Sequence, residues 1–246
     1  MKDSETAIHR AISTTLLAGR LAPGTQLVET RLAELFGVSR ERIRKVLARL
    51  GHERLLELLP NRGAFVANPS LDQAREIYEA RRIVEGGIVG RLAGRLTAAQ
   101  VDLLAAHGRR EHAALDRGDR ALSIRLSGEF HVQLAQCTGS PFVVRELHEL
   151  VSRTSMLVAF FESPGASACA CEEHQAILTA LSAGDAGSAL KAMHTHLSLI
   201  ETRLSQRTPP TAPSEPLAEL ARAWAEDGRG RTRKPPRSQR IGSAPA

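Results

Sequence analysis

Three histidines in three predicted helices are the residues of this chain best suited to chemistry. His131 shares one helical face with Ser127 and Leu134, so its imidazole is expected to point into a helical core. His174 falls early in a second predicted helix, and His196 flanks the apolar stripe of a third. Three imidazoles converging from three helices would suit a divalent transition metal. The alternative is that each is a core histidine hydrogen-bonded to backbone, which is the commoner situation for a single inward histidine.

Arg81 is a candidate for binding an anion. It lies on the same helical face as Ile77, so its guanidinium is directed toward the apolar interior, where it needs a carboxylate partner. Glu85, one turn further on, can supply that partner within the helix. A ligand carboxylate, clamped by the planar guanidinium fork, is the other possibility. Arg125 and Arg153 are weaker candidates because each falls at the edge of a helix face.

A basic helix near the N-terminus indicates a different kind of chemistry. A short helix over residues 28–36 runs into Gly37, and a new helix begins at Ser39. The apolar residues of this second helix recur every three or four positions, so one side packs inward and the other stays exposed. The helix carries the cations Arg40, Arg42, Arg44, Lys45 and Arg49. A tightly turned helix pair with a basic second helix has the geometry that enters a DNA major groove.

The stretch after the basic helix is typical of a wing. Two short apolar runs, at 55–59 and 64–66, flank the turn residues Pro60-Asn61-Arg62-Gly63 and predict a β-hairpin. A hairpin that directly follows a basic helix is the wing of a winged helix-turn-helix.

From residue 71 onward the helical period continues with few strand signals. Thr97 and Gln100 form a predicted capping box, and Ser140 followed by Pro141 is typical of a helix start. The fold class predicted is therefore mainly α, a winged helix-turn-helix over residues 1–69 and an all-helical bundle over 70–207 that is large enough for a ligand cavity. Helices are expected at 5–18, 71–94, 97–115, 119–137, 140–161, 170–182 and 185–206.

Residues 208–246 differ in composition and predict a disordered basic tail, with a short amphipathic turn around 217–224. We favour a solvated tail over a non-specific DNA tether, since nothing constrains its geometry.

The whole chain of 246 residues has a formal net charge of +6, which favours a polyanionic partner. It has neither an apolar run of about 20 residues nor a secretory signal, so no membrane association and a cytoplasmic location are expected. Three cysteines, without framework spacing, are expected to be reduced thiols: Cys137, Cys169 and Cys171.

The ordered motifs of the first 68 residues resemble the GntR-type winged-helix transcription regulators. The residues that carry this resemblance are Leu21-Ala22-Pro23-Gly24, Leu27-Val28-Glu29, Leu32-Ala33, Gly37-Val38-Ser39-Arg40, Arg44, Leu47, Leu50 and Pro60-Asn61-Arg62-Gly63-Ala64-Phe65-Val66. The remainder is similar to the FadR-like branch with its helical, effector-binding FCD domain. That likeness rests on Arg81 with Glu85, Phe130-His131, Glu173-His174, Gly184-Asp185 and His196-Leu197.

The resemblance implies a DNA-binding surface and a homodimer on an inverted-repeat operator. The DNA-binding residues expected are Thr30, Ser39, Arg40, Arg42, Arg44, Lys45, Asn61, Arg62 and Gly63. The chain departs from the family pattern at Arg42, where a proline is usual, at Lys45, where a glutamate is usual, and at Arg54, where a glycine is common.

The resemblance also implies a metal site and a small organic-acid effector. His131, His174 and His196 match the family's metal-binding histidines, with zinc or nickel the expected ion. The usual fourth ligand, Asp or Asn, is replaced by Ser127, so a three-histidine site with water, weak metal binding, or an anion without metal all remain open. Cys171 is a further possible ligand. The effector-binding residues expected are Arg81, Ser127 and Arg153.

Together these features predict a DNA-binding transcription regulator, in which an effector in the helical domain modulates operator affinity. A repressor is the expected form, and the protein is not expected to be an enzyme. A metal-dependent hydrolase is the first alternative, weakened because only Glu173 adjoins one of the histidines and is expected to face away from it. A non-specific architectural DNA-binding protein is the second.

Overall fold

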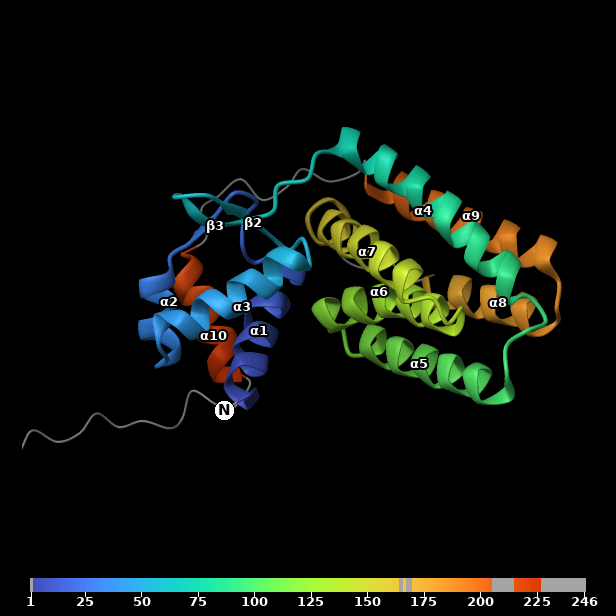
Figure 1. Ribbon diagram of the computed structural model, residues 1–246, viewed down its shortest axis with the longest axis horizontal. Helices are drawn as coiled ribbons and strands as arrows, with labels where there is room; N and C mark the ends of the chain where they lie inside the picture. The colour runs from blue at the N-terminus through green and yellow to red at the C-terminus, as the bar shows by residue number, and fades with distance from the viewer. Residues whose placement is uncertain (1, 164–165, 167–169, 205–214, 227–246) are drawn as a thin grey trace, which may run out of the picture.

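The computed structural model describes residues 2–163, 166, 170–204 and 215–226, which form two helical parts joined by a short connection (Figure 1). The N-terminal part, called the head below, holds a small sheet and three helices before residue 68. The second part, called the helical domain below, holds six helices among the described residues. This arrangement confirms the predicted mainly α fold.

The head is a helix-turn-helix with a three-stranded antiparallel sheet. Gly37 ends the second helix in the left-handed conformation, at φ 64°, which lets the chain turn sharply into the third. The strand order is β1-β3-β2, with Leu56 opposite Val66 and Leu27 opposite Ala64. The first strand was not predicted because two residues carry no readable alternation. The elements are α1 (Lys2–Leu17), β1 (Gln26–Leu27), α2 (Glu29–Phe36), α3 (Arg40–His52), β2 (Leu56–Leu59) and β3 (Gly63–Val66).

The helical domain follows the predicted helices closely because its boundaries are set by local capping. Thr97 and Gln100 form the expected capping box, and the Ser140 side chain accepts a hydrogen bond from the Val143 amide. In the packing, α4 lies against α7 and α9, α5 against α6 and α8, and α6 against α7. The helices are α4 (Leu71–Leu92), α5 (Ala98–Asp116), α6 (Arg120–Cys137), α7 (Pro141–Phe161), α8 (Ala170–Ser182) and α9 (Ala186–Leu204).

A further helix, α10 (Pro216–Glu226), returns to the head and packs against α1 and α2 (Figure 1). It occupies the segment where only a short amphipathic turn was expected. The basic residues that follow, from 227 onward, lie outside the described residues, as does Cys169. Within the described part of the chain, no helix is both long and apolar enough to cross a membrane.

Besides the chain itself, contacts between described residues join the head to the helical domain. Helix α1 packs against α6 and α7. Arg54, just before the wing, forms an ion pair with Glu149 of α7 at 3.2 Å. Arg54 has φ 57°, a left-handed conformation that glycine adopts without strain, which gives a physical reason why glycine is common at this position.

Candidate DNA-binding surface and buried histidine centre

The residues expected to contact DNA lie on the exposed side of the head. They come from the first turn of α2, the first half of α3 and the tip of the β2–β3 hairpin (Figure 1). Arg42 differs from the rest because it is half-buried, so it is less available to DNA than the sequence suggested. The exposed members are Thr30, Ser39, Arg40, Arg44, Lys45, Asn61, Arg62 and Gly63.

Glu29 organises the basic side chains of α3. Its two carboxylate oxygens accept hydrogen bonds from Nε and Nη2 of Arg44, at 3.2 and 3.0 Å, and Arg40 lies 3.8 Å away. The hydrogen bond from Arg44 lowers the pKa of Glu29. A bidentate pair of this kind fixes the plane of the guanidinium before DNA arrives. The sequence analysis named Glu29 as part of a motif but gave it no role, although its place at the start of α2 beside Thr30 was a usable signal.

The wing tip is also held in place by the head itself. Asn61 adopts φ 60°, as Asn does more readily than most residues. The Gln26 side chain of β1 donates to the Arg62 carbonyl at 2.9 Å, and the Arg62 guanidinium lies over the Phe65 ring at 5.7 Å. The short first strand therefore positions the tip.

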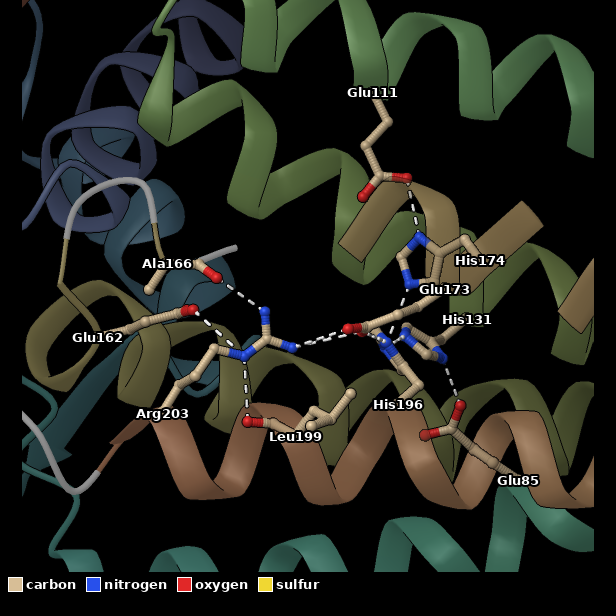
Figure 2. Close-up of polar contacts among 10 residues, drawn as sticks. All are labelled: Glu85, Glu111, His131, Glu162, Ala166, Glu173, His174, His196, Leu199 and Arg203. Atoms are coloured by element: carbon tan, nitrogen blue, oxygen red, sulfur yellow. Dashed lines mark hydrogen bonds and ion pairs between the residues drawn. The ribbon is translucent and has the colours of Figure 1, made fainter. Parts of the chain in front are cut away.

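The three histidines meet in the core of the helical domain. Their side chains come from α6, α8 and α9 and are at most 2% exposed. His196 Nε2 lies 3.2 Å from Nε2 of both His131 and His174 (Figure 2). The Phe130 ring stacks on His174 with centroids 4.1 Å apart and closes one side. His131 points inward as its helical face predicts, and His174 and His196 are buried beside it.

A glutamate contacts the outward-facing nitrogen of each imidazole. Glu85 Oε2 is hydrogen-bonded to Nδ1 of His131 (Figure 2). In the same way, Glu111 Oε2 lies 2.9 Å from Nδ1 of His174, and Glu173 Oε2 lies 2.6 Å from Nδ1 of His196. Because an ionised carboxylate only accepts hydrogen bonds, each Nδ1 carries the proton. Carboxylates that hold the second ring nitrogen in this way are the usual support of a metal-binding histidine.

Glu173 points away from its neighbour His174, as the helical period predicts, but it reaches His196 on the adjacent helix, which was not expected. Glu111 was not recognised at all, since 63 residues separate it from His174.

Burial favours the neutral form of two of these histidines, His131 and His196. Burial lowers the pKa of His131 to about 4, an effect that Glu85 offsets only in part, and burial also holds the pKa of His196 well below its ordinary value. Burial opposes the ionisation of Glu85, but Arg81 and His131 outweigh it and lower its pKa to about 2. With His131 and His196 neutral and protonated at Nδ1, their Nε2 lone pairs point toward the centre of the cluster.

This donor set fits a divalent metal ion. Two Nε2 atoms that both present a lone pair repel each other at 3.2 Å unless a proton or a cation lies between them. A tetrahedral zinc with bonds of about 2.0–2.1 Å would place its nitrogen ligands about 3.3 Å apart, close to the observed spacing. His131, His174 and His196 are the one group in the described part of the chain with this geometry.

A small cavity adjoins the histidines. Its volume is about 40 Å³, and its lining includes Ser127, His131, Arg81 and Tyr78. Arg81 donates to Glu85 at 2.7 Å and to Thr154 at 2.9 Å, so the internal pair considered from the sequence exists. Its remaining nitrogen, Nη2, and the Tyr78 hydroxyl have no hydrogen-bond partner among the described residues although both are buried.

Three other candidates do not line this cavity. Arg153 instead pairs with Glu149 at 2.9 Å and lines a cleft of about 1230 Å³ between the head and the helical domain. It is an edge residue of α7, and the neighbouring glutamate holds it on the outer side. Cys171 is outside the histidine group, and burial together with Glu111 raises the pKa of its thiol to about 12, so it offers no thiolate at neutral pH. Arg125 forms an exposed pair with Glu129.

Comparison with known proteins identifies both parts. Residues 5–66 match the model of the bacterial regulatory proteins of the gntR family, and residues 76–199 match the FCD domain. The chain belongs to the GntR family. It has the N-terminal GntR helix-turn-helix and the C-terminal FCD domain of the FadR-like subfamily, and it is a DNA-binding transcription regulator and not an enzyme.

Relatives of the GntR family extend over most of the chain. The repressor RspR of Escherichia coli is 26% identical over 202 residues, covering 81% of this chain and 88% of its own. The repressor NanR of Citrobacter rodentium is 29% identical, with 72% and 76% covered. The solved structure of E. coli McbR/YncC shares the fold, with a TM-score of 0.67 at 21% identity, covering 79% of this chain and 93% of that one.

Proposed function

We propose that this protein is a repressor whose affinity for its operator is modulated by a small organic acid, bound in the FCD domain beside a divalent zinc or nickel ion. It acts as a homodimer on an inverted repeat, with one head on each half-site. In this proposal the domain limits are residues 1–69 and 70–207. Support for the repressor role comes from the names of two relatives, RspR and NanR.

The observation that carries the proposal is the pair of unpartnered buried polar atoms next to the histidines. A buried guanidinium nitrogen without an acceptor is costly, and proteins keep few such groups. Arg81 Nη2 and Tyr78 Oη border the same cavity as His131 and Ser127. A carboxylate in this cavity would accept from both donors while lying beside the histidine centre.

His131, His174 and His196 would hold the metal, and Glu85, Glu111 and Glu173 would fix the imidazole orientations. When bound, the metal supplies a positive centre with an open coordination position that attracts an anionic ligand. Ser127 leaves that position open because a neutral hydroxyl is a weak ligand. Arg81 supplies the second positive group, and Thr154 keeps its guanidinium in place.

The cavity is too small for an organic acid of several carbon atoms, since about 40 Å³ holds only a few water-sized groups. Binding therefore requires the helices around it to move apart. A packed core responds to such an insertion by shifting whole helices, which is the kind of change that can alter the placement of the heads.

The test combines ligand binding with DNA binding. The purified protein is screened by thermal shift against Zn²⁺, Ni²⁺ and a panel of small carboxylic acids, because a ligand that binds the folded state raises the melting temperature. Ligands that raise the melting temperature are then added to complexes of the protein with promoter DNA and with random DNA over a salt series. We expect the protein to bind promoter DNA more tightly than random DNA, and the carboxylic acid to abolish this tighter binding. Equal binding to both DNAs, or no response to any metal or acid, would refute the proposal.

A further inference from the structure

Helix α10 is an addition to the head that lies outside both family matches. The matches cover residues 5–66 and 76–199, whereas α10 follows them in the sequence and packs against α1 and α2 (Figure 1). Leu220 of α10 is fully buried and belongs to the continuous apolar core, and Ala223 is 9% exposed. A helix of 11 residues is marginal in water by itself, so α10 depends on the head for its stability.

The aromatic contact of α10 is made at the end of α2. The Trp224 ring meets the Phe36 ring edge-on, with centroids 5.0 Å apart. Phe36 is the last residue of α2, directly before Gly37, where the chain turns into α3. A second contact, between Glu226 and Arg20 at 3.8 Å, joins the end of α10 to the loop after α1. Because aromatic pairs have preferred geometries, Trp224 restrains the position of the Phe36 ring as well as covering it.

Helix α2 in turn determines where the DNA-binding side chains of α3 lie. At its start, Glu29 accepts two hydrogen bonds from Arg44 and lies 3.8 Å from Arg40. At its end, the backbone amides of Gly37 and Val38 donate to carbonyl groups of the last turns of α2, at 3.3 and 3.1 Å. Both ends of α2 are therefore connected to α3, and a shift of α2 would displace both arginines.

We propose that α10 is a positioning element of the DNA-binding head, in which Trp224 holds Phe36 and thereby aligns Arg40 and Arg44 with the bases of the operator. Trp224 acts through Phe36 and is a positioning residue. Hydrogen bonds to base edges depend on the alignment of the donor, whereas contacts to phosphates carry no sequence information. Loss of α10 packing should therefore reduce sequence discrimination more than general DNA affinity. The proposal needs neither the metal nor the effector, so it can fail or hold independently of the regulation proposed above.

The affinities of the full-length protein for two DNA duplexes test this role. One duplex is selected from a random library by the unaltered protein, and the other has the same composition in scrambled order. Trp224→Ala should bind the selected duplex about tenfold more weakly, as expected when one base-reading arginine is misplaced. Its affinity for the scrambled duplex should be unchanged, because phosphate contacts do not require the same alignment of α3.

Three control proteins separate positioning from stability and from charge. Trp224→Phe keeps an aromatic ring against Phe36 and should retain most of the discrimination between the duplexes. Phe142→Ala removes an exposed aromatic ring from α7 in the helical domain and should behave like the unaltered protein. A chain that ends at Glu226 keeps α10 but lacks the basic residues that follow. It should keep the ratio of the two affinities.

Amide hydrogen exchange measures the turn between α2 and α3 directly and without DNA. In Trp224→Ala the amides of Gly37 and Val38 should exchange faster, because their hydrogen bonds to α2 open more often. The Val66 amide, which donates to the Thr25 carbonyl at 2.8 Å, should keep its exchange rate and serves as the internal control for the stability of the head.

Three results would overturn the proposal. The first is an unchanged ratio of the two affinities in Trp224→Ala. The second is equally faster exchange at Val38 and Val66, which would mean that α10 only stabilises the head as a whole. The third is the same loss of discrimination in the chain that ends at Glu226, which would assign the effect to the basic residues beyond α10. If Trp224→Ala does not fold, Trp224→Leu is measured in its place, since it keeps an apolar side chain against Phe36 without the ring.

Discussion

A double-mutant cycle on Arg81 and Glu85 tests the interpretation of the buried centre most directly. The two side chains are 4% and 1% exposed and lie 2.7 Å apart. The changes are Arg81→Met, Glu85→Met and the double substitution, which replace the charged groups with apolar chains of similar size. Glu85→Gln serves as a control because an amide oxygen can still accept from His131.

The expected energies follow from burial. Removing one partner leaves an uncompensated buried charge, so each single change should lower the free energy of unfolding by about 3–5 kcal/mol. The double change leaves no orphan charge, and Thr154 keeps its bonds to the Leu150 and Val151 carbonyls. The remaining loss is the acceptor of His131 Nδ1, about 1–3 kcal/mol. The double variant should therefore be more stable than either single variant, with a coupling energy of at least about 3 kcal/mol.

Urea unfolding of the metal-free proteins measures these stabilities, and calorimetry with Zn²⁺ provides an independent readout. Arg81→Met keeps the bond between His131 and Glu85, so its Zn²⁺ affinity should change little. Glu85→Met and the double variant should bind Zn²⁺ about 10–100-fold more weakly, because the imidazole loses its orienting carboxylate. Every variant that lacks Arg81 should lose the response of operator binding to carboxylic acids.

Additive stabilities would refute the reasoning, since they would mean that Arg81 and Glu85 do not compensate each other in the folded protein. Unchanged Zn²⁺ affinity in Glu85→Met would remove Glu85 from the support of His131. An acid response that persists in Arg81→Met would remove the guanidinium from the effector site.

Three further predictions concern other regions. Arg44→Ala should reduce the discrimination against the wrong base at one operator base pair by about 1–3 kcal/mol. Glu29→Gln should reduce the same discrimination without weakening binding to random DNA. Competition with single-base operator variants measures both effects, and an equal loss of affinity for all sequences would instead show that Arg44 contacts phosphates. Arg54→Gly should be more stable to urea than Arg54→Val by about 1–2 kcal/mol, because only glycine accepts the left-handed backbone there without strain; equal midpoints would contradict this. Finally, the metal-free protein should lose stability as the pH falls from 6.5 toward 4. The pKa of His131 is 6.5 in the unfolded chain and about 4 in the folded protein, so the unfolded chain binds the proton first as the pH falls. The loss should approach about 3 kcal/mol for this residue, and a flat profile of urea midpoints with chelator present would show that His131 is not buried as a neutral base.

Local patterns in the sequence determined most of the fold. The spacing of apolar residues located α3 and its exposed basic side, and the capping residues placed the starts of α5 and α7. The turn residues around Asn61 predicted the wing. The face of α6 also indicated that His131 points inward. These features are local because the helical period and the capping hydrogen bonds involve residues at most a few positions apart.

Only the tertiary structure decided which groups meet. Glu111 and His174 are 63 residues apart, and Glu173 contacts a histidine on another helix because two neighbouring positions on α8 face different partners. The packing of α10 against α2 likewise depends on the arrangement of the other helices of the head, which leaves an apolar surface for it to cover. Periodicity says which side of a helix is buried, but the neighbour on that side is chosen by the packing of the whole core, and no sequence spacing records it. The sequence alone thus determined a DNA-binding head and the inward direction of His131, whereas the carboxylates behind the three histidines and the return of the chain to the head came from packing.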